Sequence, residues 1–317
     1  MRNTGMRQNG GVEVLRVLLM FGITVLHQSA EFGVVRSFIG RLSEVCVVGF
    51  VFISGWYGIR FSFAKLVRLY GLGLFAAILT GIVLKFPSGV GDVVTSVVWF
   101  LNCFWFLHAY AVLMCLAPIL NMPFENGVPE SARRVVLVPT LVLVFGYCFV
   151  AVLPGVRDWL PLFAGCSTHG FLTLAGIYLA SRWGRSLALD RLSVKHCAEI
   201  ALLTAVPCGF GLGKFNSPFA LLFAGALFLM FAKIRLPNKI CSGFVFLGRS
   251  MFTVYLLQIG FVGLCIPPKI KMLCLSGYAG AFLSALAVFL VCLALDLVRR
   301  MVLAAILKMP LTARRWK

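Results

Sequence analysis

The chain has 317 residues, of which 61% are hydrophobic and 12% are charged, roughly half the charged share of soluble domains. A soluble fold could not cover so much apolar surface, whereas lipid solvates the outward faces of helices that satisfy their own backbone hydrogen bonds. This composition excludes a soluble domain, and the formal net charge of +19 must be tested against membrane topology before it is assigned to nucleic-acid binding.

Apolar runs of roughly 17 to 25 residues, long enough to cross a bilayer, recur along the chain. The first follows a short basic N-terminus. We expect a retained helix and not a cleaved signal, because no small-residue cleavage site follows and Arg16 lies inside the run. The fold predicted is an all-α, polytopic membrane bundle of about ten helices, at residues 12–30, 45–59, 66–84, 96–119, 135–153, 161–180, 197–213, 217–232, 244–266 and 277–305.

The distribution of Lys and Arg indicates the topology. With the N-terminus in the cytoplasm, 20 of the 29 cations fall on inside segments and 7 on outside segments. The asymmetry predicts that both termini are cytoplasmic, with tails at 1–11 and 306–317 around one transmembrane domain spanning 1–317 in the cytoplasmic membrane. The positive charge then serves topology and contact with anionic membrane lipids, and we expect no nucleic-acid partner.

Cysteines give no sign of a metal centre. The 11 cysteines form no CxxC pair, and most lie inside apolar runs, where they are typical of small hydrophobic residues. We expect neither disulfides nor a metal site.

The first helix carries two ionisable side chains on one face. Arg16 and His27 are eleven residues apart, which is within about 20° of whole helical turns and a rise of roughly 16 Å. Each has an ordinary explanation, since Arg16 could snorkel to the inner interface and His27 could bond a backbone carbonyl at the outer one. Together they favour a site, because a desolvated neutral imidazole suits a general base and a guanidinium can hold an anion.

Several motifs in order resemble one family. The Arg16-x10-His27 helix resembles the first helix of the acyltransferase family 3 membrane proteins, which O-acetylate surface polysaccharides and related envelope sugars. The remaining matching stretches are 50–56 (FVFISGW), 65–70 (KLVRLY), 105–121 (WFLHAY followed by APILN) and 247–258 (LGRSMFTVYLLQ). The resemblance covers essentially the whole chain.

Two positions depart from the family pattern. Gln258 stands where the family often has His, so this position cannot act as an acid or base. Glu13 replaces the more frequent Asp and keeps the carboxylate.

What the resemblance implies is an acetyl-CoA or other acyl-CoA donor at a cytoplasmic mouth and a glycan or lipid-linked sugar hydroxyl as acceptor, with no permanently bound cofactor. Arg16, Lys65 and Arg68 would meet the donor phosphates, Glu13 would orient Arg16, and His27 would take the hydroxyl proton or relay the acyl group. Trp105, Tyr110 and Tyr255 would line the acyl or substrate tunnel.

Ordinary roles stand beside these. Lys65 and Arg68 are also typical of positive-inside anchors, and Trp105 and Tyr110 of interfacial aromatics. His108 and His169 would add polar lining, and His196 has no specific role. The competing hypotheses are a transporter or flippase of lipid-linked sugars and a non-catalytic relative of the family, the latter favoured by Gln258. The sequence gives no oligomeric state, acceptor sugar or acyl length.

Overall fold

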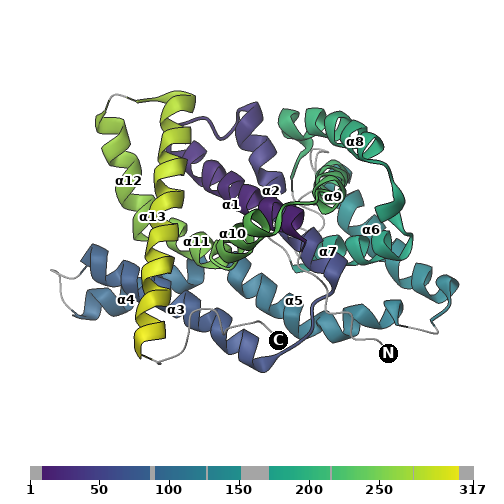
Figure 1. Cartoon of the computed structure of the whole chain (residues 1–317), viewed down its shortest axis with the longest axis horizontal. Coiled ribbons are helices and arrows are strands. Elements are labelled where there is room, and N and C mark those ends of the chain that lie inside the picture. Colours follow the sequence, from purple (N-terminus) through teal and green to yellow (C-terminus); the bar gives the residue numbers. More distant parts are fainter. Residues whose placement is uncertain are drawn as a thin grey trace.

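The computed structural model describes residues 9–85, 90–125, 128–150, 171–214, 216–273 and 275–306. Within these ranges the chain forms helices and no strand, which confirms the all-α prediction (Figure 1). The α-helices are α1 (Gly10–Glu31), α2 (Phe38–Tyr57), α3 (Phe63–Lys85), α4 (Val90–Cys103), α5 (Trp105–Asn121), α6 (Glu130–Val150), α7 (Phe171–Ser186), α8 (Val194–Pro207), α9 (Pro218–Ala232), α10 (Asn238–Gly248), α11 (Met251–Ile259), α12 (Phe261–Met272) and α13 (Gly277–Ile306). Shorter turns are η2 (Met122–Phe124), η5 (Leu189–Arg191) and η6 (Cys208–Leu212).

The first helix lies at the centre of the bundle. Asn9 fixes its start, because its side chain accepts a hydrogen bond from the Gly11 N–H at 3.0 Å and donates one to the Ala232 carbonyl of α9 at 2.6 Å. α1 then packs against α2, α9, α10, α11, α12 and α13. Most of its surface therefore meets protein, although Leu18 is 49% exposed, and this allows polar side chains such as Thr24 and Gln28, both at most 2% exposed, to lie along it.

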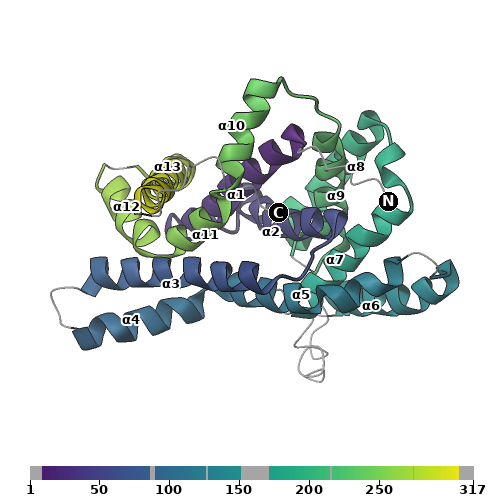
Figure 2. The ribbon, with the colours of Figure 1, turned by 60° about the horizontal axis from the view of Figure 1, so that its bottom comes forward.

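The helices form two groups. Figure 2 shows α3, α4, α5 and α6 along one side of the molecule, with the remaining helices packed above them. α3 lies against α4, α11 and α5, and α7 joins the groups through its contacts with α2, α5 and α6.

The prediction of one continuous helix at 96–119 is wrong. The chain leaves helical geometry at Phe104 (φ −82°, ψ 55°), so that α4 ends and α5 begins there. His108 compensates for the break: its Nε2 lies 2.9 Å from the Leu101 carbonyl, which can only accept, so Nδ1 is left to accept from the Tyr70 hydroxyl at 3.3 Å. His108 thus satisfies a backbone carbonyl at the helix break.

Two other predicted helices are also interrupted. The run at 244–266 is divided into α10, α11 and α12, with breaks at Arg249–Ser250 and at Gly260. At Gly260 a side chain would collide with the Thr80 hydroxyl. The run at 197–213 leaves the α-helix after Pro207, and Gly211 adopts φ +100°, which favours glycine. Apolar composition alone could not locate these breaks.

Other boundaries also differ from expectation. α2 begins at Phe38 and not at 45, since the Ser37 hydroxyl accepts from the Gly40 N–H at 3.3 Å. α1 begins inside the expected 1–11 tail, at Gly10. Parts of the predicted helices 135–153 and 161–180, His169, and the expected tail after 306 lie outside the described residues.

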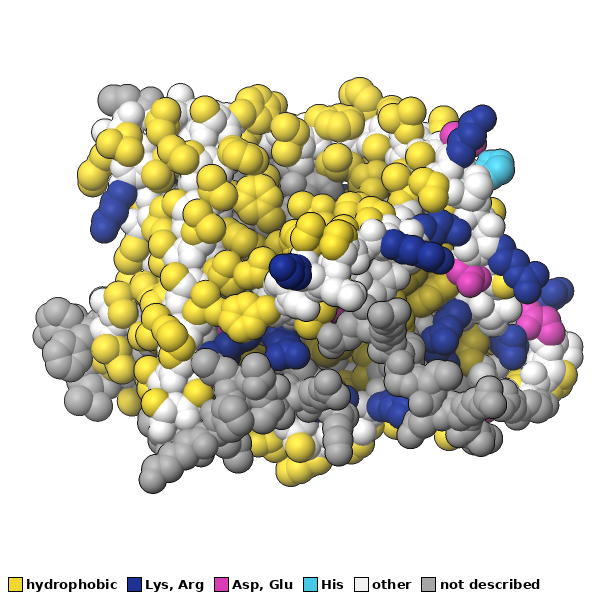
Figure 3. All heavy atoms as spheres, viewed as in Figure 1, with side chains coloured by type: hydrophobic (Ala, Val, Ile, Leu, Met, Phe, Trp, Pro, Cys, Tyr) yellow, Lys and Arg dark blue, Asp and Glu magenta, His cyan; other side chains and the backbone are white. Residues whose placement is uncertain are grey.

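Six helical stretches of the described chain are long and apolar enough to cross a membrane. They are Gly10–Glu31, Phe38–Tyr57, Phe63–Leu84, Trp105–Phe124, Asn238–Ile259 and Gly277–Ala305. Large hydrophobic side chains also cover the outside, among them Leu202, Leu203 and Phe210, each at least 72% exposed. Figure 3 shows one such face, largely hydrophobic, with Lys and Arg gathered toward its lower and right parts. The chain is a multi-pass membrane protein, while the number of ten spans and the side of each terminus stay predictions.

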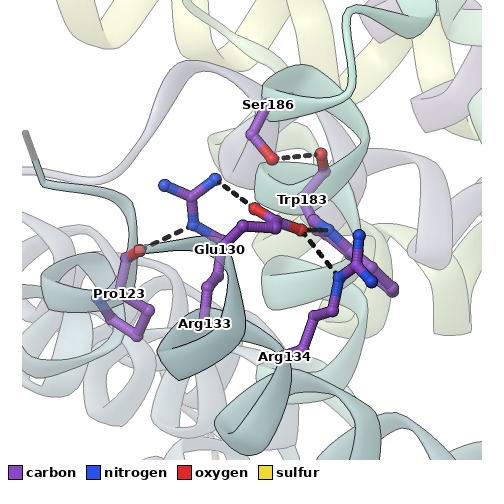
Figure 4. Close-up of polar contacts among 6 residues, drawn as sticks. All are labelled: Pro123, Glu130, Arg133, Arg134, Trp183 and Ser186. Atoms are coloured by element: carbon purple, nitrogen blue, oxygen red, sulfur yellow. Dashed lines mark hydrogen bonds and ion pairs between the residues drawn. The ribbon is translucent and has the colours of Figure 1, made fainter. Parts of the chain in front are cut away.

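A polar cluster ties α6 to α7. Glu130 pairs with Arg133 at 2.9 Å and with Arg134 at 3.3 Å, and accepts from the Trp183 indole at 3.4 Å (Figure 4). Arg133 also donates to the Pro123 carbonyl at 2.8 Å. Desolvation alone would raise the pKa of the Glu130 carboxyl, but the hydrogen bonds from Arg134 and Trp183 and the two arginine charges lower it below its ordinary value.

Candidate functional site

A cavity of about 580 Å³ lies among α1, α2, α3, α5, α10 and α11. This volume is in the range of small-molecule sites. The cavity brings together all eight side chains that the sequence singled out: Glu13, Arg16, His27, Lys65, Arg68, Trp105, Tyr110 and Tyr255. Their proximity is a property of the structure, whereas the chemical role of each stays a prediction.

Helix periodicity explains how α1 contributes to the cavity wall. Glu13, Arg16, Met20, Ile23 and His27 are spaced by three or four residues, and all of them line the cavity. Because each residue adds 1.5 Å along the helix, Arg16 and His27 lie roughly 16 Å apart along the wall. The cavity therefore has a polar end and a distant imidazole.

The polar end, which we call the charged mouth, comprises Glu13, Arg16, Arg60, Lys65, Arg68 and Arg249. Glu13 is the one carboxylate on the described lining, and it pairs with Arg16 at 2.6 Å. The Glu13 side chain is 9% exposed and that of Arg16 is 35% exposed. Glu13 therefore holds the guanidinium from the buried side, and part of the Arg16 side chain stays accessible. Five cations around one carboxylate leave a net positive charge, which attracts anions.

Two distant side chains hold the loop that carries Arg60. α2 ends at Gly58 (φ +78°), where any Cβ would press on the guanidinium of Arg182. The Tyr178 hydroxyl accepts from the Ile59 N–H at 3.0 Å and donates to Asn121 Oδ1 at 2.7 Å, and Asn121 Nδ2 donates to the Ile59 carbonyl at 3.0 Å. Both backbone groups of Ile59 are thus fixed by α5 and α7, which restricts where Arg60 can lie.

Aromatic rings line the middle of the cavity. Phe106 stacks on Tyr110 with ring centroids 5.8 Å apart and meets Tyr255 edge-on at 5.6 Å. Trp105 lies beside them on the lining, and the Tyr110 hydroxyl is 3.5 Å from Ser54 Oγ. This wall suits an apolar or amphipathic chain better than a charged group.

At the other end of the cavity, which we call the His27 end, the lining residues are His27, Ile23, Leu26, Val47 and Phe50. No described carboxylate lies within ion-pair distance of the His27 imidazole. An imidazole in such a place can accept a proton from a bound hydroxyl.

Gln258 lies behind the cavity wall and not on it. Its side chain is 2% exposed and its Oε1 accepts a hydrogen bond from the Thr24 hydroxyl, so it joins α11 to α1 one turn before His27. Four residues along α1, Gln28 accepts from Ser284 of α13 at 2.9 Å. These amides position the helix that carries His27.

Sequence reasoning missed Arg60 and Arg249 as lining residues. Arg60 lies in the short segment after α2, and the turn at Gly58 precedes it on the cavity lining. Arg249 carries a signal in the sequence, because a cation inside an apolar run is costly, and the same argument singles out Arg16.

Other candidates lie elsewhere. His108 supports the α4–α5 break, as described above, and His196 bonds Ser193 at 2.7 Å on an exposed helix start. In the described part of the chain, no group of three or more His, Cys, Asp or Glu is arranged to hold a metal, and eight cysteines, including Cys46 and Cys292, are free thiols.

Comparison with known proteins gives one match. A family model described as an acyltransferase domain, of acyltransferase family 3, matches residues 9–297. No curated protein and no solved structure gives a significant match to the chain.

Proposed function

The chain belongs to acyltransferase family 3, and we propose that it transfers an acetyl or other acyl group from a cytoplasmic acyl-CoA to a sugar hydroxyl of an envelope glycan. The observation that carries this proposal is the single cavity that joins the charged mouth to His27. Its two ends have the chemistry that the two halves of a thioester donor require.

The separation of Arg16 and His27 matches the length of the coenzyme A arm. Between the pyrophosphate and the sulfur of coenzyme A lies a chain of roughly a dozen bonds, which spans about 15 Å when extended at the advance per bond of ordinary covalent chains. Arg16 and His27 are separated by roughly 16 Å along α1. A phosphate at Arg16 would therefore place the thioester beside His27.

Charge supports the same donor. Coenzyme A carries roughly four negative charges on its phosphates, and the mouth offers five cations against one carboxylate. Arg16, Lys65 and Arg68 would bind the pyrophosphate, and Glu13 would hold the Arg16 guanidinium in place. The aromatic middle, with Trp105, Tyr110 and Tyr255, would enclose the uncharged arm and exclude water from the thioester.

The transfer would use His27 as the base. Its imidazole nitrogen takes the proton of the acceptor hydroxyl while the oxygen attacks the thioester carbonyl. The carbon–sulfur bond then breaks, the thiolate leaves, and the proton on His27 passes to the sulfur to give free coenzyme A. A relay in which His27 itself carries the acyl group would use the same geometry.

Orientation follows from the cations. The mouth includes the loop residue Arg60 with Lys65 and Arg68, which the positive-inside rule assigns to the cytoplasm. The donor is a cytoplasmic metabolite, so the charged mouth would face that side of the cytoplasmic membrane. The acceptor hydroxyl would then reach His27 from the other side.

The test compares surface glycans and donor binding. Mass spectrometry of glycans from cells with the gene, without it, and complemented with His27→Ala should show acyl groups only with the wild-type protein. Isothermal titration of purified protein in lipid nanodiscs should show acetyl-CoA binding. Donor-independent accumulation of sugar in vesicles would instead indicate a transporter, and absence of both activities would indicate a non-catalytic relative.

A further inference from the structure

Arg249 has an environment unlike that of the other arginines near it. It lies in the turn between α10 and α11, lines the charged mouth, and its buried Nε has no hydrogen-bond partner among the described residues. No described carboxylate lies within ion-pair distance of it. An unneutralised guanidinium in a cavity wall is costly unless an anion visits it.

The neighbouring arginines of α13 are already neutralised. Asp296 is 0% exposed and pairs with Arg299 at 2.6 Å and with Arg300 at 2.8 Å. Arg300 donates to the Ser250 hydroxyl at 2.8 Å and lies over the Phe246 ring at 5.5 Å. The Arg300 guanidinium therefore already has an anionic partner and a hydroxyl partner, and it holds the α10–α11 turn. Arg249 has an Nε without a partner.

The turn is also fixed from the side of α1. A Cβ on Gly248 would collide with the Glu13 carboxylate, so Gly248 and Glu13 lie in contact. Glu13 is three residues before Arg16, which puts it about 4.5 Å farther from His27 along α1. Arg249 follows Gly248 directly and therefore lies at the mouth, at the level of the Glu13–Arg16 ion pair.

We propose that Arg249 binds the 3′-phosphate of the donor's nucleotide, and that Arg300 is a positioning residue that fixes the Arg249 turn through Ser250. This rests on the proposed function. In coenzyme A the 3′-phosphate lies past the pyrophosphate as seen from the thioester. A donor whose thioester is at His27 and whose pyrophosphate is at Arg16 presents that phosphate at the mouth, where Arg249 lines the cavity beside Gly248. A phosphomonoester is also the group that a free guanidinium binds best.

The decisive experiment needs only the wild-type protein. Isothermal titration in nanodiscs compares acetyl-CoA with 3′-dephospho-acetyl-CoA, which lacks this phosphate and keeps the pyrophosphate and thioester. We expect the dephospho donor to bind about 10-fold more weakly or worse, the effect of losing a charge-assisted hydrogen bond. Equal affinity for the two donors would overturn the proposal. Failure of both donors to bind would instead contradict the proposed function.

Variants assign the phosphate to Arg249. In Arg249→Gln the affinity for acetyl-CoA should fall to that of the dephospho donor, and the discrimination between the donors should disappear. Arg249→Lys, which keeps the charge, should restore part of it. Arg191→Gln, the loss of an exposed arginine in η5, is the matched control and should keep the full discrimination. Retained discrimination in a folded Arg249→Gln protein would refute the assignment.

A last variant tests the positioning role. Ser250→Ala removes only the hydroxyl that Arg300 holds. We expect the KM for acetyl-CoA to rise severalfold with a much smaller change in kcat, and the discrimination against the dephospho donor to shrink. A lower thermal midpoint with undiminished discrimination would show that the contact is only structural.

Discussion

The two ends of the cavity are built in different ways. The charged mouth gathers side chains from α1, the α2–α3 loop, α3 and the α10–α11 turn, and its loops are fixed by Asn121 of α5, Tyr178 of α7 and Arg300 of α13. The His27 end presents its imidazole from a single helix, aligned with Arg16 by periodicity alone. The mouth therefore depends on tertiary contacts, and the His27 end depends on the position of α1. Changes at the mouth should alter donor binding, and changes at the His27 end should alter chemistry.

The largest effect should come from the His27 end. His27→Ala should lower the turnover number by about 10²- to 10⁴-fold, the usual contribution of a general base, while the Kd for acetyl-CoA stays close to the wild-type value. Titration and a glycan acylation assay on the same preparation measure the two quantities. A loss of donor binding equal to the loss of turnover would contradict the division between donor binding at the mouth and chemistry at His27.

Arg16→Gln should give the opposite pattern at the mouth. It removes a donor–phosphate contact and leaves Glu13, which is 7% exposed, without its ion pair. We expect the Kd for acetyl-CoA to rise about 10- to 100-fold, as for loss of a charged hydrogen bond. Arg16→Lys should recover part of the affinity, since it keeps the charge and loses the bidentate geometry. A variant with normal affinity and no turnover would place Arg16 with the chemistry.

Tyr178→Phe tests whether the mouth is held from a distance. The change deletes the hydroxyl that binds Ile59 and Asn121 and leaves the Ile59 N–H buried without a partner. We expect a loss of about 1–3 kcal/mol in stability, with a severalfold rise in Kd and little change in turnover at saturating donor. Tyr278→Phe, at a residue that is 58% exposed, is the control. Unchanged affinity in a destabilised Tyr178→Phe protein would mean that Arg60 does not depend on this contact.

The smallest effect should come from Glu130, which is remote from both ends. Glu130→Gln weakens the α6–α7 cluster, so the thermal midpoint should fall slightly while donor affinity and turnover stay the same. Because the pKa of Glu130 is lowered in the folded protein, its stabilisation is present above its ordinary pKa of 4.5 and is lost as the pH falls through the lower folded value. The midpoints of wild type and variant should therefore converge in acid. A difference between the two midpoints that stays constant across pH would show that the charge of Glu130 does not cause it.

The sequence predicted what local periodicity determines. The α-helical class, the face shared by Arg16 and His27 and the long C-terminal helix all follow from spacing and apolar run length. The order of the family motifs predicted further site residues, and the structure places all of them on the same cavity: Lys65, Arg68, Trp105, Tyr110 and Tyr255.

The rest depends on contacts between distant segments. The break at Phe104 has no Gly or Pro to mark it and relies on His108, and the Arg249–Ser250 turn relies on Arg300, fifty residues later in the chain. A hydropathy window averages the few polar residues at both places into a continuous apolar run. Six described stretches meet the length and composition for crossing a membrane, and the predicted number of about ten spans stays a prediction.

Gln258 has a consequence for how protons move in each turnover. On the described lining, His27 is the one imidazole, and the one carboxylate, Glu13, is at the far end. The amide at position 258 cannot take a proton from His27, so no acid–base relay continues behind it. Under the proposed function, the proton of the sugar hydroxyl would therefore leave on the sulfur of the released coenzyme. Acetyl-CoA and free coenzyme A carry the same charge, and the sugar and its ester are both neutral, so the transfer would move no net charge across the membrane and consume no free proton. The electrochemical gradient would then neither drive nor oppose glycan modification.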